Sequence, residues 1–160
     1  MWSVCCPLCV VASMDYLQIR DGALDVKSIT NAWFDEFKRQ NYGAIITFVG
    51  VVRDECYIEG LSFDIYEPIL KSWFDMWQAK AGNQDAVILM AHSLGDVALH
   101  ESSFLAGVCS PQRKVALKLI EDFVEDFKAS APIWKYDMRD GRRIWIEKRG
   151  KNLKHSGILN

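Results

Sequence analysis

The sequence predicts one mixed α/β domain, and three observations support this prediction. Apolar residues recur at helical spacing over residues 111–128, a nearly unbroken apolar run rich in β-branched residues fills residues 43–52, and Asp140-Gly141 separates two short strand-like segments. The chain has 160 residues, half of them apolar, and a formal net charge of −2. This length suits one well-packed domain and is too short to expect two. Helices and strands are mixed along the chain, with antiparallel pairing expected near its C-terminal end.

The first thirteen residues differ in composition from the rest of the chain. They carry no charge and are mostly apolar. They lack the positive region of a secretory signal and are too short to span a bilayer, so export and membrane insertion are poorly supported. Met14 is a candidate natural start, and we expect residues 1–13 to be a disordered upstream or non-native extension. Residues 14–149 are the predicted domain, and residues 150–160 are predicted to be a flexible polar tail.

The cysteines favour a reducing, cytoplasmic setting over a disulfide framework. Cys56 and Cys109 stand alone, and the other three lie in the first thirteen residues. Cys6-Pro-Leu-Cys9 has the spacing of a zinc knuckle, but no second pair of Cys or His follows at a matching interval, so no metal site is predicted. A zinc or redox module built on these cysteines is an alternative, and it would lose its function with residues 1–13.

The first half of the domain is predicted to contain a short strand, a helix and a long strand. The short strand covers residues 16–19, and Asp25 is a candidate cap for the helix that follows, which ends by Gly43. One face of this helix carries Ile29, Trp33 and Phe37. The apolar run at residues 43–52 is typical of a strand buried on both faces, and Arg53 comes directly after it.

The second half of the domain follows a polar loop at residues 54–60. Its strands are predicted at residues 61–66, 85–92, 103–109, 133–138 and 143–147, and one helix is predicted at residues 67–80. Ser93-Leu-Gly-Asp96 has the composition of a turn and separates the second of these strands from the third. Asp140-Gly141 predicts a hairpin between the last two strands.

The helix predicted at residues 111–128 is strongly amphipathic. Its apolar stripe consists of Val115, Ala116, Leu119, Ile120, Phe123, Val124 and Phe127. The other side carries Lys114, Lys118, Glu121, Asp122, Glu125 and Asp126. Ser110 suits the N-cap and Pro111 the first helical position, whereas Pro132 stops the helix shortly after Lys128. Arg113 and Lys128 lie on one flank of the stripe, where we expect partly buried stems at the border between core and solvent.

Familiar catalytic motifs do not occur in the sequence. It has no glycine-rich phosphate loop, no nucleophile elbow and no pair of histidines at metal-ligand spacing, and His92, His100 and His155 are interpreted as structural or solvated. Basic residues are dispersed, which argues against a nucleic-acid partner. A set of cations remains at the ends of predicted strands and helices. It consists of Arg53, Arg113, Lys128, Lys135 and Arg149.

Each of these cations has a simple structural interpretation and a functional one. A single long basic side chain at such a position commonly covers apolar surface with its stem, and Arg53 can simply mark where solvent begins. Lys135 is different because it follows Trp134 and precedes Tyr136 in an apparent strand, where the alternation gives little reason for a cation. Together the cations leave open a local pocket for anions.

Three segments follow one another in a recognisable order. They are Gly43-Ala-Ile-Ile-Thr-Phe-Val-Gly-Val-Val-Arg53, the Gln112-Arg113 step that opens a helix, and Lys128-Ala-Ser-Ala-Pro-Ile-Trp-Lys135 followed by Asp140-Gly141 and Trp145. In this order they resemble the large, catalytic subunit of molybdopterin synthase, the MoaE family. The resemblance covers roughly residues 15–149.

The resemblance implies an α/β hammerhead fold with an additional antiparallel β subdomain. It implies a cytoplasmic enzyme that transfers sulfur to cyclic pyranopterin monophosphate and makes molybdopterin in molybdenum cofactor biosynthesis. The sulfur comes from a ubiquitin-like small subunit whose C-terminal Gly-Gly ends in a thiocarboxylate. A homodimer of large subunits carries one small subunit at each end, and the step needs no cofactor, metal, nucleic acid or membrane.

The resemblance also implies roles for individual residues. Lys128 and Lys135 match the catalytic lysines, and we assign Lys128 to the thiocarboxylate and Lys135 to the pterin. The substrate-binding positions are Arg53, Gln112, Arg113, Asp137 and Arg149. The chain departs from the family at Gln112, where a His is usual, and at Asp137, where a Glu is usual. Gln112 can donate a hydrogen bond but cannot titrate, so anion binding through Arg113 is retained while an acid–base role is not.

The positions of Arg113 and Lys128 add a geometric prediction. At 1.5 Å per residue they lie about 22 Å apart on one helix, too far to hold one small substrate together. If both serve one pocket, two chains must build it, with Arg113 and the free N–H groups of the neighbour's helix forming a phosphate site. The alternative to an enzyme is a non-enzymatic module that binds the tail of a ubiquitin-like carrier.

Overall fold

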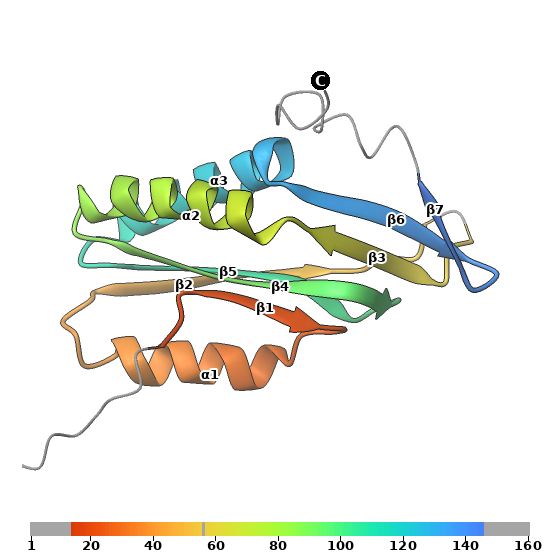
Figure 1. Cartoon of the computed structure of the whole chain (residues 1–160). Coiled ribbons are helices and arrows are strands. Elements are labelled where there is room, and N and C mark those ends of the chain that lie inside the picture. Colours follow the sequence, from red (N-terminus) through yellow and green to blue (C-terminus); the bar gives the residue numbers. More distant parts are fainter. Residues whose placement is uncertain (1–13, 56, 146–160) are drawn as a thin grey trace, which may run out of the picture.

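The computed structural model describes residues 14–55 and 57–145 (Figure 1). Its strands form one sheet in the order β2-β5-β4-β3-β6-β7, with β1 paired to residues 90–94 in the middle of β4. The strands are β1 (Leu17–Asp21), β2 (Ala44–Val51), β3 (Gly60–Ile65), β4 (Val87–Ala98), β5 (Ser102–Ser110), β6 (Ile133–Arg139) and β7 (Arg142–Trp145). β1 runs parallel to β4, and the other pairs are antiparallel. The β3-β6-β7 part is therefore an antiparallel subdomain at one end of the sheet.

Strand β4 joins the two parts of the sheet. It pairs with β5 as far as His92 and with β3 from Gly95 onward. The prediction of a turn at Ser93–Asp96 is wrong, because these residues belong to β4 and the chain reverses only at Leu99 and His100. Gly95 has a φ of 76° and marks the irregularity at which β4 changes partner. A glycine inside a strand commonly marks such an irregularity. Gly95 thus indicated a local change in the backbone and not a reversal of the chain.

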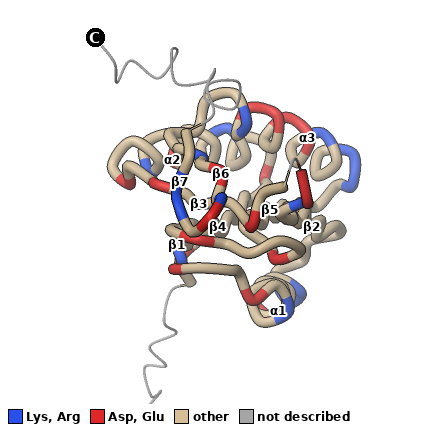
Figure 2. Tube along the Cα trace, turned by 90° about the vertical axis from the view of Figure 1, so that its right-hand side faces the viewer, with Lys and Arg blue, Asp and Glu red and all other residues tan. Residues whose placement is uncertain are grey.

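The helices cover both faces of the sheet, as Figures 1 and 2 show. α1 (Val26–Phe37) lies on one face, and α2 (Glu67–Gly82) and α3 (Arg113–Ser130) lie together on the other. The predicted cap of α1 is confirmed, since Oδ1 of Asp25 accepts a hydrogen bond from the backbone N–H of Ser28 at 3.0 Å. The Asp25 cap thus sets the residue at which α1 begins.

Apolar cores hold the helices on the sheet. The core under α1 includes the predicted residues Ile29, Trp33 and Phe37. Trp33 is fully buried against Gly107, where an added Cβ would lie 3.0 Å from the indole ring. The core under α2 and α3 contains Leu70, Trp73, Phe74, Trp77, Leu119, Phe123 and Val124, in agreement with the predicted stripes. A smaller core under the subdomain contains Val52, Ile58, Leu61, Phe63 and Val97.

Strand β2 is not buried on both faces, so that prediction is wrong. It is the edge strand of the sheet, paired only with β5 among the described strands. Thr47, Val49 and Val51 alternate toward solvent, and 38% of Val49 and 51% of Val51 is exposed. A continuous apolar run does not by itself tell a central strand from an edge strand.

Helix α3 begins two residues later than predicted and, as predicted from Pro132, ends shortly after Lys128, at Ser130. Gln112 is the N-cap residue, and Ser110 instead ends β5, where its hydroxyl oxygen accepts the backbone N–H of Gln112 at 3.2 Å. Ala131 leaves the helix with an extended ψ of 133° before Pro132, as the residue preceding a proline should. Lys128 therefore lies in the last turn of α3, and the chain continues directly into β6.

The predicted hairpin at Asp140-Gly141 is confirmed. Both residues have positive φ values, 50° and 64°, and Arg139 pairs with Arg142 across the turn. Residues 1–13 and 150–160, predicted to be an extension and a tail, lie outside the described residues, as do Arg149 and His155. In the part of the chain that the structure describes, no helix is long and apolar enough to cross a membrane.

Candidate active site

The last turn of α3 is tied to α2 through Asp126. Its Oδ2 accepts hydrogen bonds from the indole Nε1 of Trp73 at 2.9 Å and of Trp77 at 2.8 Å, and its Oδ1 accepts one from the Ser130 hydroxyl at 2.8 Å. The prediction that Asp126 faces solvent is wrong. Two tryptophans one helical turn apart on α2 need an acceptor for their N–H groups when they pack, and Asp126 supplies it.

The Asp126 carboxylate stays charged in this position. Burial alone would raise its pKa, but the hydrogen bonds from Trp77, Ser130 and Trp73 and the charge of Lys80 outweigh that effect and lower the pKa below its ordinary value. A charged acceptor makes stronger hydrogen bonds than a neutral one. The contact therefore fixes the turn that carries Lys128 relative to the rest of the fold.

Replacing Asp126 with Ala should destabilise the fold by about 2 kcal/mol, because two packed indole donors lose their acceptor. Urea unfolding measures this loss. Glu125→Ala is the matched control, since Glu125 is exposed and lies 3.7 Å from Lys128, so its removal should cost about 0.5 kcal/mol or less. Equal losses in the two variants would contradict the role given to Asp126.

The loss of stability in Asp126→Ala should depend on pH. Because the pKa of Asp126 is lowered on folding, the unfolded chain takes up a proton near the ordinary value of 3.8, while the folded chain does so only at lower pH. The stabilisation is therefore complete above pH 3.8 and is lost as the pH falls below it. The difference in the free energy of unfolding between the unchanged protein and Asp126→Ala should become smaller as the pH falls below 3.8.

Lys128 lies on the exposed side of α3. Its side chain is 62% exposed, and its Nζ is 3.7 Å from Oε1 of Glu125. The expectation of a partly buried stem is wrong for Lys128 and also for Arg113, which is exposed too. The flank that carries them turns away from the sheet, as the 57% exposure of Leu117 shows. The residue before Lys128, Phe127, points inward instead.

Lys135 lies on β6 and is half-buried. In the register of β3 and β6 it is directly opposite Phe63, so both side chains project from the same face of the sheet. Trp134 and Tyr136 project from the opposite face, where they line a hollow of about 370 Å³ together with Asp64, Ile65 and Tyr66. The aromatic neighbours of Lys135 in sequence therefore do not surround its ammonium group.

His92 lies in a cluster of aromatic rings next to both lysine-bearing elements. It is 2% exposed, and its ring is 5.0 Å from that of Phe63, 5.8 Å from that of Phe104 and 5.5 Å from that of Phe127. Phe127 stacks on Phe104 with 4.0 Å between ring centroids. Phe127 precedes Lys128, and Phe63 is opposite Lys135. The cluster thus connects the end of α3 to β3, the strand that pairs with β6.

The imidazole of His92 is held in its neutral form. Burial lowers its pKa to about 4, a hydrogen bond to the Ser93 carbonyl works in the opposite direction, and the charge of Lys135 lowers the pKa further. Sequence reasoning had assigned His92 a structural role, and its only distinguishing signal was an isolated polar ring at the end of an apolar strand run.

Arg53 lies at the same end of α3 as these lysines. It follows β2, whose Val51 pairs with Ser102 at the beginning of β5, the strand that carries Phe104. The Arg53 side chain is 80% exposed and forms an ion pair with Glu55. The fold thus gathers Arg53, Lys128 and Lys135 around one region of the molecule.

Gln112 and Arg113 lie at the other end of α3. The helix is continuous from Arg113 to Ser130, so the separation of about 22 Å between Arg113 and Lys128 stands. Both Gln112 and Arg113 are exposed, and the Gln112 side chain does not cap the helix. Within one chain these two residues are therefore apart from the lysines.

Asp137 is buried beside Lys135, two residues further along the same face of β6. It is 1% exposed, and its Oδ2 accepts a hydrogen bond from Nη2 of Arg139 at 3.2 Å. Its predicted contact with substrate stays a prediction. Arg149, the remaining predicted position, is outside the described residues.

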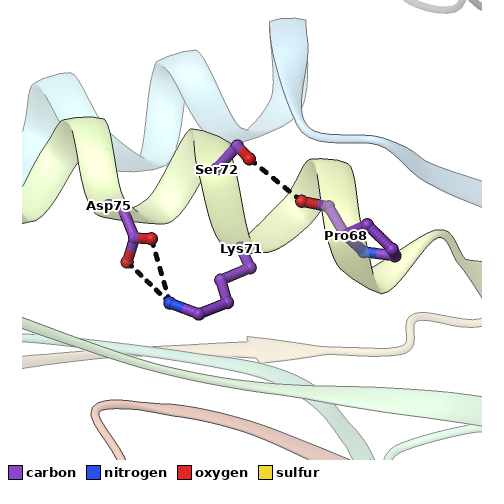
Figure 3. A network of polar contacts seen from close by, with 4 residues as sticks. All are labelled: Pro68, Lys71, Ser72 and Asp75. Carbon is purple, nitrogen blue, oxygen red and sulfur yellow. Dashed lines mark hydrogen bonds and ion pairs between the residues drawn. The ribbon is translucent and has the colours of Figure 1, made fainter.

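A hollow of about 850 Å³ lies away from these residues, between β1 and α2. Of the predicted site residues that the structure describes, none lines it. Its lining includes Lys71, but the Lys71 ammonium is bound by both carboxylate oxygens of Asp75, at 2.9 and 3.2 Å, on a turn where the Ser72 hydroxyl donates to the Pro68 carbonyl (Figure 3). The lining also contains Asp15, Asp21 and Glu67. An anionic substrate is not favoured there.

Metal-binding and thiol chemistry find little support in the described residues. Residues 14–55 and 57–145 contain no group of three or more His, Cys, Asp or Glu side chains that could hold a metal ion. Burial raises the pKa of Cys109 to about 12, so its thiol stays protonated and is a poor nucleophile. The chemistry available at the candidate site is that of exposed or half-buried cations near a neutral imidazole.

Comparison with known proteins gives one consistent family. The model of the MoaE protein family matches residues 19–130. The "Molybdopterin synthase catalytic subunit" of Helicobacter pylori (strain 26695) is 50% identical over 143 residues, covering 89% of this chain and 99% of that protein. The protein of the same name from strain J99 is 45% identical, with the same coverage.

Solved structures agree with this match. A chain of the protein–protein complex of subunits 1 and 2 of molybdopterin-converting factor from H. pylori has a TM-score of 0.86 and 49% identity, and the match covers 91% of this chain and 100% of that one. Molybdopterin synthase from Staphylococcus aureus, at 21% identity and a TM-score of 0.71 over 83% of this chain and 98% of its own, shares the fold. The predicted hammerhead fold with its antiparallel subdomain is thereby confirmed, and the chain belongs to the MoaE family.

Proposed function

We propose that this chain is a molybdopterin synthase catalytic subunit that acts in molybdenum cofactor biosynthesis. In this role it transfers sulfur from the C-terminal thiocarboxylate of a ubiquitin-like small subunit to cyclic pyranopterin monophosphate. The observation that supports the proposal is that Phe127, next to Lys128 in sequence, and Phe63, opposite Lys135 across β3 and β6, both contact the ring of His92. The proposal places the reaction in the cytoplasm, in line with the cysteine usage of the chain.

The chemistry requires cations because both reactants are anions. In each of two successive rounds, the thiocarboxylate sulfur of one carrier forms a bond to a carbon of the pterin side chain while a carbon–oxygen bond at that carbon breaks and the departing oxygen takes the electron pair and a proton. This gives a thioester between carrier and pterin. Water then adds to the acyl carbon, the acyl carbon–sulfur bond breaks, and the carrier leaves as a carboxylate while the sulfur stays on the pterin. Negative charge develops on oxygen in these steps, and fixed ammonium groups stabilise it. Lys128 serves the thiocarboxylate end, and Lys135 serves the pterin.

A second copy of the chain completes the site in this proposal. The phosphate of the substrate binds at the beginning of the neighbour's α3, where the first N–H groups are free and where Arg113 and Gln112 are exposed. Arg53, at the end of the exposed edge strand β2, contributes a further cation. Asp137 and Arg149 complete the predicted substrate contacts, and the small subunit docks where its tail reaches Lys128.

The direct test is to incubate the purified chain with a thiocarboxylated carrier and the cyclic pterin and to measure the dithiolene product. We expect product only with the thiocarboxylate form, and none with a carrier that ends in an ordinary carboxylate. Binding of the carrier without any product would instead support a non-enzymatic module that holds the carrier tail. A chain without residues 1–13 should be as active as the full chain, which excludes a cysteine-based module.

A further inference from the structure

Strand β2 is an edge strand that lacks the features with which proteins usually protect an edge. Charged residues, proline and short length commonly keep an unpaired edge from pairing with another chain. β2 has eight residues, none of them charged and none a proline, and Val49 and Val51 on it are exposed. The other described edge strands, β1 with five residues and β7 with four, both carry charges. Of the described edges, β2 is therefore the one that favours a partner.

Helix α3 presents a second exposed surface along the same edge. α3 packs on β5 and β2, and α2 packs on β4, so the side of α3 that turns away from α2 faces the β2 edge (Figure 1). Asp126 marks the side that faces α2, because two indoles of α2 bind it. At about 100° per residue, Arg113, Leu117 and Lys128 lie on the opposite side of α3. The exposed Leu117 thus adds an apolar side chain to this edge.

The beginning of β2 is held against the beginning of α3. Gly43, the residue before β2, lies so close to Pro111 that an added Cβ would be 2.5 Å from the Pro111 carbonyl oxygen. Arg113 begins α3 two residues after Pro111, and Arg53 follows the last residue of β2 by two. The β2 edge therefore has Arg113 near one end and Arg53 near the other.

We propose that two copies of the chain pair through β2, in antiparallel orientation, around a two-fold axis perpendicular to the sheet. This inference builds on the shared site of the proposed function and names the surface that creates it. Such an axis makes one continuous sheet, keeps the helices of both copies on the same face and sets the two α3 helices side by side and antiparallel. Arg113 of each copy then lies near Arg53 and Lys128 of the other. The separation of about 22 Å within one helix is thereby bridged between chains.

The paired arrangement gathers positive charge, so the carboxylates around it matter. Three of them lie beside cations of one chain: Glu55 next to Arg53, Glu125 next to Lys128, and Asp137 two residues from Lys135 on the same face of β6. Arg113 of the second copy adds one more cation to this set. The positive charge that remains suits two anionic reactants, because a phosphate and a thiocarboxylate form charge-assisted hydrogen bonds with such groups.

A lysine placed on the edge tests the proposed pairing. Val49→Lys puts a charge on β2 at a side chain that is already 38% exposed, so the single chain should still fold. Ile144→Lys is the matched control, since Ile144 is 39% exposed and lies on the edge strand β7. Analytical ultracentrifugation of the full chain, with a reductant and without any carrier, measures the dimer. We expect Val49→Lys to weaken dimerisation about 100-fold or more, because two like charges meet at the interface, and Ile144→Lys to leave it unchanged.

Hydrogen exchange in the unchanged protein gives a second measurement that needs no variant. Alternate residues of a strand paired on one side point their N–H groups away from the partner strand, and in β2 these groups should be protected in the dimer. The corresponding amides of β7 should exchange quickly. Equally fast exchange in β2 and β7 would contradict the proposal even if Val49→Lys failed to fold. Slow exchange of β2 in a monomer would also overturn it, because another segment of the same chain would then cover the edge.

The remaining outcomes separate this inference from the proposed function. A monomeric unchanged protein, or a Val49→Lys dimer as tight as that of the unchanged protein, would overturn the β2 interface. If the dimer depends on Val49 as expected but the unchanged protein forms no product, the proposed function fails while the interface stands. Dimers that survive Val49→Lys and still make product would leave the proposed function in place and require a different interface.

Discussion

Replacing Lys128 with Ala is expected to slow sulfur transfer about 100-fold or more while leaving the fold intact. Lys128 is exposed, and its contact with Glu125 at 3.7 Å is too weak to stabilise α3 noticeably. In the proposed reaction, however, its charge faces the oxyanion that develops on the carrier's acyl group. Single-turnover assays with saturating carrier and pterin measure the effect, and thermal unfolding checks the fold.

Lys118→Ala provides the matched control for this prediction. Lys118 is an exposed lysine on the same helix, paired with Glu121 at 3.3 Å and Asp122 at 2.9 Å, and it lies ten residues before Lys128. Its loss removes one positive charge from α3 without touching the candidate site, so turnover should stay near that of the unchanged protein. Near-normal turnover in Lys128→Ala would reject the assignment of Lys128.

Mixing two inactive variants is expected to restore activity if two chains build each site. Arg113→Ala and Lys128→Ala homodimers should each be nearly inactive. Subunit exchange gives mixed dimers in which one site holds both substitutions and the other holds the intact Arg113 of one chain and the intact Lys128 of the other. With random exchange, about a quarter of all sites are intact, so activity should recover to about a quarter of that of the unchanged protein.

The outcome of this mixing experiment depends on geometry that one chain cannot provide. Arg113 and Lys128 are at opposite ends of a continuous helix, so a site made within one subunit would gain nothing from mixing. If native mass spectrometry verifies subunit exchange but the mixture does not recover activity, the result would contradict a site shared between two chains. Lys128→Ala mixed with Lys135→Ala is the control, because both residues belong to the same subunit's part of the site and no intact site can form.

Much of the fold could be predicted because its signals are local. The apolar stripe of α3, the Asp25 cap of α1 and the Asp140-Gly141 turn depend on neighbours within a few residues, and the structure contains all three. The end of α3 also followed from Pro132, within two residues. Local patterns of this kind specify an element before its tertiary contacts form.

Other features depend on contacts that the sequence does not reveal. Gly95 and Asp96 have turn composition, yet pairing with β3 keeps them extended in β4. The apolar run of β2 lies at an edge, because the order of strands is set by the whole sheet. Asp126 looked solvated, since nothing in α3 itself indicated that two indoles from α2 would need it. Tertiary pairing decided each of these cases.

The candidate site was predictable only in part. The spacing of Lys128, Pro132 and Lys135 pointed to the two lysines, and the helix length predicted that Arg113 would lie apart from them. His92 was missed because a lone histidine in an apolar run is more often a packed side chain than a functional one. Its importance depends on Phe63 and Phe127, which are far from it in sequence and meet it only in the fold.

The change of partner within β4 has a consequence for exchanging segments between relatives. Because one continuous strand carries His92 in its first half and pairs with β3 in its second, the spacing from His92 to Gly95 sets the register of the subdomain that holds Lys135. A chimera that imports β3, β6 and β7 from another member must import the later residues of β4 with them. A single-residue insertion between His92 and Gly95 would turn the side chains of the later residues of β4 to the opposite face of the sheet. It would thereby change the position of β3 and β6, and so of Lys135, relative to Lys128.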